Sequence, residues 1–190
     1  MALARYMGSS AGDLGLDRHH LVRSLQAGAV GAGAVVAGYG LARLAPSSVN
    51  LFRDERVAFL PTPLALWHLS VRIPLGTVVP EEVVFRGVLP ALLASDQDAS
   101  WLPAALPALL FGLWHVLPSL ELARASAGVR RFVGGRAPGA VALAFGVSAL
   151  AGYVFHLLRQ RTGHLAAPVL VHLTTNLVGF VLTRFASGGE

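Results

Sequence analysis

Residues 80–87 read Pro80-Glu81-Glu82-Val83-Val84-Phe85-Arg86-Gly87, and this stretch decides the fold. Three ionisable side chains fall within six residues, and apolar stretches flank them on both sides. Charged groups in apolar surroundings cost free energy unless they are paired or take part in chemistry. We therefore interpret this stretch as the centre of a functional site inside a membrane-embedded bundle of helices.

The composition supports a membrane protein. Of the 190 residues, 54% are hydrophobic and only 13% are charged, whereas a soluble domain has about a quarter charged residues. The mean hydropathy is +0.61. The net charge of +5 is carried by arginines that lie between apolar runs. That placement suits lipid headgroups and membrane topology, and it excludes a basic stripe for nucleic acid.

The absence of cysteine narrows the chemistry. It excludes disulfides, thiolate zinc sites and a cysteine nucleophile. A hydrolytic site in this chain therefore has to use carboxylates, imidazoles and amides.

The alternation of apolar runs and polar loops predicts an all-α, polytopic transmembrane bundle of about six helices, some kinked or re-entrant. We treat residues 1–190 as one membrane-embedded domain, in which residues 1–20 form a polar N-terminal tail or a surface helix. In the first apolar run, small residues at four-residue spacing suit close helix packing in lipid: Gly28, Ala32, Gly33, Ala37 and Gly40. The candidate spans cover residues 24–44, 57–79, 101–117, 138–158 and 164–184.

Prolines divide the second apolar run from the helix that follows it. Pro61, Pro63 and Pro74 predict a kinked or broken span over residues 57–79. Pro80 suits the first position of a new helix, where acidic residues are also favoured by the helix dipole. We expect this helix to run to about Ala94 and to end in the polar loop 95–98.

The arginine-rich connections do not give one consistent topology. Residues 118–136 and the basic loop 159–163 both have the composition of cytoplasmic loops, yet a single span separates them. Either the helix over residues 138–158 is re-entrant or one loop breaks the positive-inside rule.

Three pairs of residues share a four-residue spacing, which places each pair on one helix face. They are Glu82 with Arg86, Phe111 with His115, and His172 with Asn176. Glu81 is rotated from Glu82 by about 100° on a helix. One carboxylate can therefore pair with Arg86 while the other faces a different neighbour.

This set of side chains suits the activation of water. A carboxylate takes a proton from water, and imidazole and amide groups orient the water or stabilise a carbonyl oxyanion. The combination Glu81, His115 and His172 also suits a divalent metal such as zinc with an open position. The His-Glu-x-x-His motif is absent, so such a metal would be bound across three helices.

Other polar and aromatic residues have simpler interpretations. We expect His68 and His156 to be packing residues and His164 to cap a helix. Trp67, Trp101 and Trp114 are typical interfacial or packing residues.

The three motifs, Glu-Glu-x-x-x-Arg, Phe-x-x-x-His and His-x-x-x-Asn, stand in this order on successive apolar helices. Together with Phe85-Arg86-Gly87 and the stretch Gly163-His164-Leu165-Ala166-Ala167-Pro168, they resemble the CPBP family of intramembrane proteases. That family includes the type II CAAX prenyl endopeptidases and bacteriocin-processing or immunity-type proteins. The resemblance covers about residues 75–180, which we take as the protease core.

The resemblance implies an all-helical membrane fold with a conical cavity, in a bacterial cell membrane. It implies Glu81 as the base that activates water, supported by Glu82 and Arg86. It also implies that His115, His172 and Asn176 are site residues, with His172 and Asn176 on the oxyanion side. Members are often described as metalloproteases, although a metal-free glutamate mechanism is also argued for relatives. The chain is shorter before the first motif than the eukaryotic prenyl-protein enzymes, which argues against a prenylated substrate.

We therefore expect an intramembrane endopeptidase that acts on a membrane-associated peptide or protein, with membrane lipids as its surroundings and no nucleic-acid partner. The alternative is a non-enzymatic membrane binding or immunity protein on the same fold. A proton-coupled transporter would also use intramembrane Glu, Arg and His side chains. It ranks last, because the two halves of the sequence show no symmetry.

Overall fold

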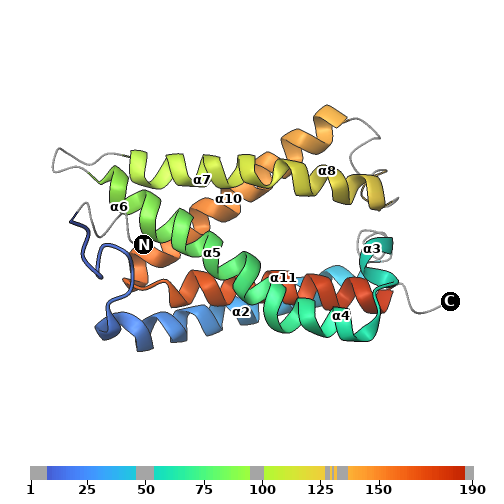
Figure 1. The fold of residues 1–190 in the computed structure, drawn as a ribbon, viewed down its shortest axis with the longest axis horizontal. Coiled ribbons are helices and arrows are strands. Elements are labelled where there is room, and N and C mark those ends of the chain that lie inside the picture. Colours follow the sequence, from blue (N-terminus) through green and yellow to red (C-terminus); the bar gives the residue numbers. More distant parts are fainter. Residues whose placement is uncertain are drawn as a thin grey trace.

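The computed structural model describes residues 8–45, 54–94, 101–126, 129, 131 and 137–186. Over these residues the chain is a bundle of helices with no β-strand (Figure 1). The predicted all-α fold is thereby confirmed. The loop 95–98 and parts of the connections 45–56 and 118–136 lie outside the described residues.

Four helical stretches are long and apolar enough to cross a membrane: Arg18–Leu44, Leu102–Arg124, Pro138–Thr162 and Ala166–Phe185. They correspond to α2 (Leu21–Leu44), to α7 and α8 together (Leu102–Trp114 and Val116–Ala125), to α10 (Ala137–Thr162) and to α11 (Ala166–Ala186). The chain is thus an integral membrane protein.

Two connections predicted from their arginines are partly helical. Residues 116–125, which overlap the predicted loop 118–136, continue as α8 directly after His115. Residues 159–162 form the last turn of α10 instead of a loop. Arginine is a good helix former, and basic side chains are favoured at a helix C-terminus, so a basic stretch need not end a helix.

The long helices form two pairs, α2 with α11 and α7 with α10. In the first pair, a Cβ atom on Gly28 would lie 3.0 Å from the Cα of Ala167, so Gly28 permits close packing as predicted. Gly33 and Gly40 have nothing within 4 Å of such an atom. Their predicted packing role is therefore wrong within the described structure: a four-residue spacing marks a face but not what covers that face.

The second pair packs closely at two glycines. A Cβ atom on Gly112 of α7 would lie 2.7 Å from the carbonyl oxygen of Phe145 on α10. A Cβ atom on Gly152 of α10 would lie 3.3 Å from the Cα of Ala108 on α7. Small residues that let two backbones approach are typical of helix pairs in lipid.

A kinked helix crosses the space between the two pairs (Figure 1, green). It follows the short helix α3 (Glu55–Ala58) and runs from Thr62 to Leu93 without a loop. Three π-helical segments interrupt its α-helical ones. The segments are α4 (Thr62–Trp67), η3 (His68–Arg72), η4 (Pro74–Val78), α5 (Val79–Glu82), η5 (Val83–Val88) and α6 (Leu89–Leu93).

This kinked helix confirms the broken span predicted over residues 57–79 and corrects the predicted separate helix. Pro80 does lie at the start of α5, but the preceding residue keeps α-helical dihedrals and no loop intervenes. A π-turn accommodates the missing N–H of proline without ending the helix. Glu81 and Glu82 consequently lie in the middle of a continuous helix.

The N-terminal segment is packed rather than free, in contrast to the predicted tail. We call residues 8–17 the N-terminal strap. The side chain of Leu14 is fully buried, and the Arg159 guanidinium donates to the carbonyl oxygens of Gly12 (2.8 Å) and Asp13 (3.0 Å). Leu165 donates its N–H to the Gly15 carbonyl oxygen at 2.8 Å. The strap thus closes one end of the bundle against α10 and the start of α11.

Two local features hold the strap in shape. Gly15 has a φ of +73°, a conformation that glycine adopts without strain, and it lies directly against the Arg159 side chain. Ser10 donates its hydroxyl and its backbone N–H to Asp13 Oδ2, both at 2.7 Å, and these bonds lower the pKa of the Asp13 carboxyl.

The burial of Leu14 gives a first prediction. Leu14→Ala is expected to lower the free energy of unfolding by about 2–5 kcal/mol, because it removes buried apolar atoms and leaves a cavity. Thermal unfolding in detergent micelles measures this change. Leu16→Ala is the matched control, since Leu16 is 39% exposed and should cost far less. Equal melting temperatures for the two variants would contradict the packed strap.

Candidate active site

The site is assembled from the kinked helix, the junction of α7 and α8, and α11. Glu81, Glu82 and Arg86 come from the kinked helix, His115 stands between α7 and α8, and His172 lies on α11. The structure brings these five predicted residues together. The sequence alone could not establish this meeting, because the three motifs are far apart along the chain.

Glu82 and Arg86 form the ion pair that their spacing predicts. Glu82 Oε1 lies 3.2 Å from an Arg86 guanidinium nitrogen, and the two side chains are 0% and 1% exposed. The guanidinium carbon also lies 4.0 Å from the centre of the Phe111 ring and 5.1 Å from that of Phe155. Aromatic faces attract cations, so the rings supplement the carboxylate in this buried setting.

Glu82 also orients His172. The Nδ1 of His172 lies 2.8 Å from Glu82 Oε1. An ionised carboxylate only accepts hydrogen bonds, so Nδ1 carries the proton and a neutral ring keeps a lone pair on Nε2. This assignment follows from the partner group and directs the Nε2 lone pair of His172 toward Glu81.

His115 is held in the same tautomer by a backbone carbonyl. Its Nδ1 lies 2.8 Å from the carbonyl oxygen of Phe111, which can only accept. The Phe111 ring lies 4.3 Å from the imidazole of His115, centre to centre. Together these contacts fix the ring and direct its Nε2 to Glu81.

One oxygen of Glu81 is the meeting point of both imidazoles. Glu81 Oε2 lies 3.9 Å from Nε2 of His115 and 3.8 Å from Nε2 of His172. It is buried and has no hydrogen-bond partner among the described residues. Three acceptor atoms therefore face one another with no donor between them, an arrangement suited to a small molecule that brings its own protons.

Trp114 is a member of the site that the sequence prediction missed. Its Nε1–H donates to Glu81 Oε1 at 3.0 Å. The sequence predicts an interfacial or packing residue at this position, and the 60% exposure of Trp114 fits that description. Its position directly before His115 was the available signal, since neighbouring residues at a helix end can reach the same cavity.

Aromatic rings set the position of His172 as well. Phe155 of α10 stacks on its imidazole with ring centres 5.1 Å apart and an angle of 24°. Phe111 meets the same ring edge-on at 5.7 Å. The predicted Phe-x-x-x-His pair therefore contributes a packing residue and a polar one to the same site.

Asn176 lies one turn after His172 on α11 and is partly buried. Within the part of the chain described, no hydrogen bond joins its amide to Glu81, Glu82 or either imidazole. Asn176 therefore lies next to the cluster that we define as Glu81, Glu82, Arg86, His115 and His172, but it is not hydrogen-bonded to the carboxylates or imidazoles of that cluster.

One histidine outside this cluster, His164, caps a helix as predicted. His164 Nδ1 accepts the backbone N–H of Ala166 at 2.9 Å, so it caps the start of α11 as predicted. His164 is partly buried next to Arg159, and burial and that charge lower the pKa of His164. His156 is buried on α10, as expected of a packing residue, but its Nδ1 lacks the expected hydrogen-bond partner among the described residues.

A metal at Glu81, His115 and His172 does not fit this geometry. Ligand atoms on a tetrahedral zinc ion at about 2.0–2.1 Å stand about 3.3 Å apart, closer than the 3.8 and 3.9 Å measured from Glu81 Oε2. Over the described residues, no group of three or more His, Cys, Asp or Glu side chains is placed to hold a metal ion. The metalloprotease class is therefore not supported, and we derive no step through a metal.

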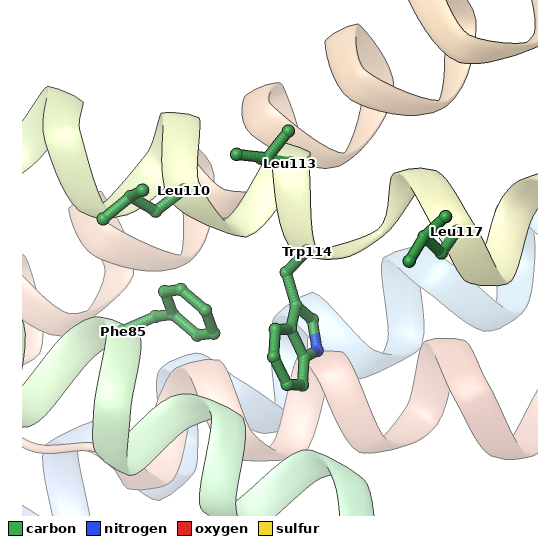
Figure 2. A pocket seen from close by; sticks show the side chains of 5 residues that line it. All are labelled: Phe85, Leu110, Leu113, Trp114 and Leu117. Atoms are coloured by element: carbon green, nitrogen blue, oxygen red, sulfur yellow. The ribbon is translucent and has the colours of Figure 1, made fainter.

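An apolar hollow of about 390 Å³ opens beside the cluster (Figure 2). Its lining comes from the kinked helix, α7 and α8: Phe85, Leu110, Leu113, Trp114 and Leu117. The Trp114 indole lies beside the Phe85 ring in this lining (Figure 2). The same indole donates a hydrogen bond to Glu81, so the Trp114 side chain contacts both the hollow and the carboxylate.

The comparison with protein families identifies a family for this chain. Residues 63–178 match the model of a family described as type II CAAX prenyl endopeptidase Rce1-like. The matched range includes the whole cluster and Asn176, and it covers more than half of the chain. No curated protein and no solved structure matches the chain.

Proposed function

The chain belongs to the type II CAAX prenyl endopeptidase Rce1-like family of membrane proteases, and from this membership we propose a specific reaction. The protein hydrolyses a peptide bond of a membrane-associated substrate, using a water molecule that Glu81 activates. The observation that carries the proposal is the convergence of two imidazole Nε2 atoms on Glu81 Oε2.

This convergence suits a nucleophilic water. A water molecule at about 2.8 Å from Glu81 Oε2 and from one imidazole Nε2 fits their separation of 3.8 or 3.9 Å. It would donate its two hydrogens to acceptors and point a lone pair toward a bound carbonyl carbon. Glu81 Oε2 then takes one proton while the oxygen attacks, in the manner of a general base.

The remaining groups support the transfer of that proton. When the C–N bond of the tetrahedral intermediate breaks, the proton passes from Glu81 to the leaving amine through an imidazole Nε2. Glu82 accepts from Nδ1 of His172 and so stabilises the ring while it carries the proton. Arg86 balances the buried charge of Glu82. We assign the amide of Asn176, one turn after His172 on α11, to the carbonyl oxygen of the substrate.

The hollow offers a place for an apolar part of the substrate. It adjoins the cluster through Trp114, so an apolar chain in it lies next to Glu81. A substrate with an apolar residue or a lipid group close to its scissile bond could place that apolar part in the hollow. We propose membrane-associated peptides as the substrate class, with or without a prenyl group.

Hydrolysis in isotopic water tests the proposal. The purified chain in liposomes is incubated with a CAAX-type peptide, prenylated or unmodified, in H₂¹⁸O. We expect cleavage with one ¹⁸O atom in the new carboxylate, detected by mass spectrometry. A comparison of the two peptides decides whether the prenyl group is needed. Absence of cleavage of both peptides at any concentration would count against a CAAX-type substrate.

A further inference from the structure

We propose that Trp114 is a positioning residue of the hydrolytic site. Its indole N–H holds one oxygen of the Glu81 carboxylate, so that the other oxygen faces both imidazoles. This inference rests on the proposed function of Glu81 and adds the residue that fixes its orientation.

The geometry gives the two carboxylate oxygens different surroundings. Glu81 Oε1 accepts the Trp114 N–H at 3.0 Å, whereas Oε2 has no hydrogen-bond partner among the described residues. The last torsion of a glutamate side chain is broad, so an unheld carboxylate turns readily. The bond from Trp114 restricts this rotation and keeps Oε2 between His115 and His172.

The chemistry of the neighbours makes an indole suitable. Both imidazoles are held through Nδ1 and present lone pairs, so neither neutral ring donates to Glu81. An indole N–H only donates and never competes for a proton. A hydrogen bond to a charged acceptor is also stronger than a neutral one, particularly away from water. Trp114 can therefore hold the base without taking part in proton transfer.

The position of Trp114 also explains why a large, half-exposed aromatic residue stands beside a polar cluster. Its ring lines the hollow together with Phe85, whose ring centre is 6.4 Å away (Figure 2). A substrate chain in the hollow touches the same indole that holds Glu81. Substrate binding and the orientation of the base are thus linked through one side chain.

A structural measurement tests the hydrogen bond without any activity. The chain has three tryptophans, so the indole N–H region of a ¹H–¹⁵N spectrum in detergent micelles contains three signals. Trp114→Phe identifies the signal of Trp114. Glu81→Ala removes the acceptor and should move that signal, while the signals of Trp67 and Trp101 stay. Glu121→Ala is the control, since Glu121 is 68% exposed on α8 and all three signals should stay. A Trp114 signal that Glu81→Ala leaves in place overturns the inference.

A kinetic measurement tests the positioning role. Replacing Trp114 by 3-benzothienylalanine exchanges the N–H for sulfur and keeps the shape of the ring in the hollow. We expect kcat to fall about tenfold or more, the equivalent of one hydrogen bond to a charged group, with KM changed less than twofold. The same exchange at Trp101, which is 72% exposed, should leave both constants unchanged.

The outcomes separate this inference from the proposed function. An unchanged kcat for the benzothienyl variant, in a protein that Glu81→Gln inactivates, overturns the positioning role and leaves the hydrolytic role of Glu81 intact. Full cleavage by Glu81→Gln itself overturns both, because no base then needs to be positioned.

Discussion

Glu81→Gln is expected to lower the rate of peptide cleavage by about 10²–10⁴-fold, the usual contribution of a positioned general base. Glutamine keeps the size of the side chain and can still accept the Trp114 N–H, so the fold should persist. It cannot take a proton from water at Oε2, where both imidazoles converge. Initial cleavage rates in liposomes measure the loss, and an unchanged melting temperature shows that the protein is folded.

The control for this variant is Glu121→Gln. Glu121 lies on α8 with 68% of its side chain exposed, and its replacement should leave the cleavage rate unchanged. Wild-type cleavage by Glu81→Gln would refute the proposed base. If the chain were a non-enzymatic binding or immunity protein, Glu81→Gln would instead leave partner binding largely intact, and no cleavage would be found in either protein.

Arg86→Met is expected to lower the free energy of unfolding by about 3–5 kcal/mol, the cost of leaving one member of a buried ion pair alone. Glu82 is 0% exposed and would keep only His172 as a partner. The substitution also removes the attraction between the guanidinium and the rings of Phe111 and Phe155. Unfolding in detergent micelles by heat or denaturant measures the change.

Two further variants test the reason for this loss. Glu121→Gln is the matched control, because it removes a pair with Arg56 in which the two side chains are 68% and 46% exposed, and exposed pairs contribute about 0–1 kcal/mol. In the double variant Arg86→Met with Glu82→Gln, the lone buried charge is gone, so part of the lost stability should return. If the double variant were less stable than Arg86→Met, the unpaired charge of Glu82 could not be the reason for the lost stability.

The helical architecture was largely accessible from the sequence. Apolar runs of membrane-spanning length predicted the four long helices, since a lipid core requires every backbone group to be bonded within a helix. Local spacing also predicted the Glu82–Arg86 pair and the cap at His164, because residues within one turn have few ways to be arranged. These features depend only on neighbours along the chain.

Predictions that used prolines and arginines to mark the ends of helices were less successful. Pro80 suggested a helix start, but π-turns carry the kinked helix through its prolines. Arg159 suggested a loop, but it lies in the last turn of α10 and binds the N-terminal strap. Arginine is itself a good helix former, and the cost of about 3 kcal/mol that proline imposes inside a helix can be outweighed by packing against a distant segment.

The sequence by itself determined the membrane-spanning helices and the residue types of the proposed hydrolytic site. Only the tertiary structure decided that Glu81 Oε2 faces both imidazoles, that Glu82 holds His172, and that Trp114 holds Glu81. It also decided that Leu14 of the N-terminal strap is buried. The physical reason is that these contacts join segments far apart in sequence, and their geometry depends on how kinked helices cross, which no local periodicity encodes.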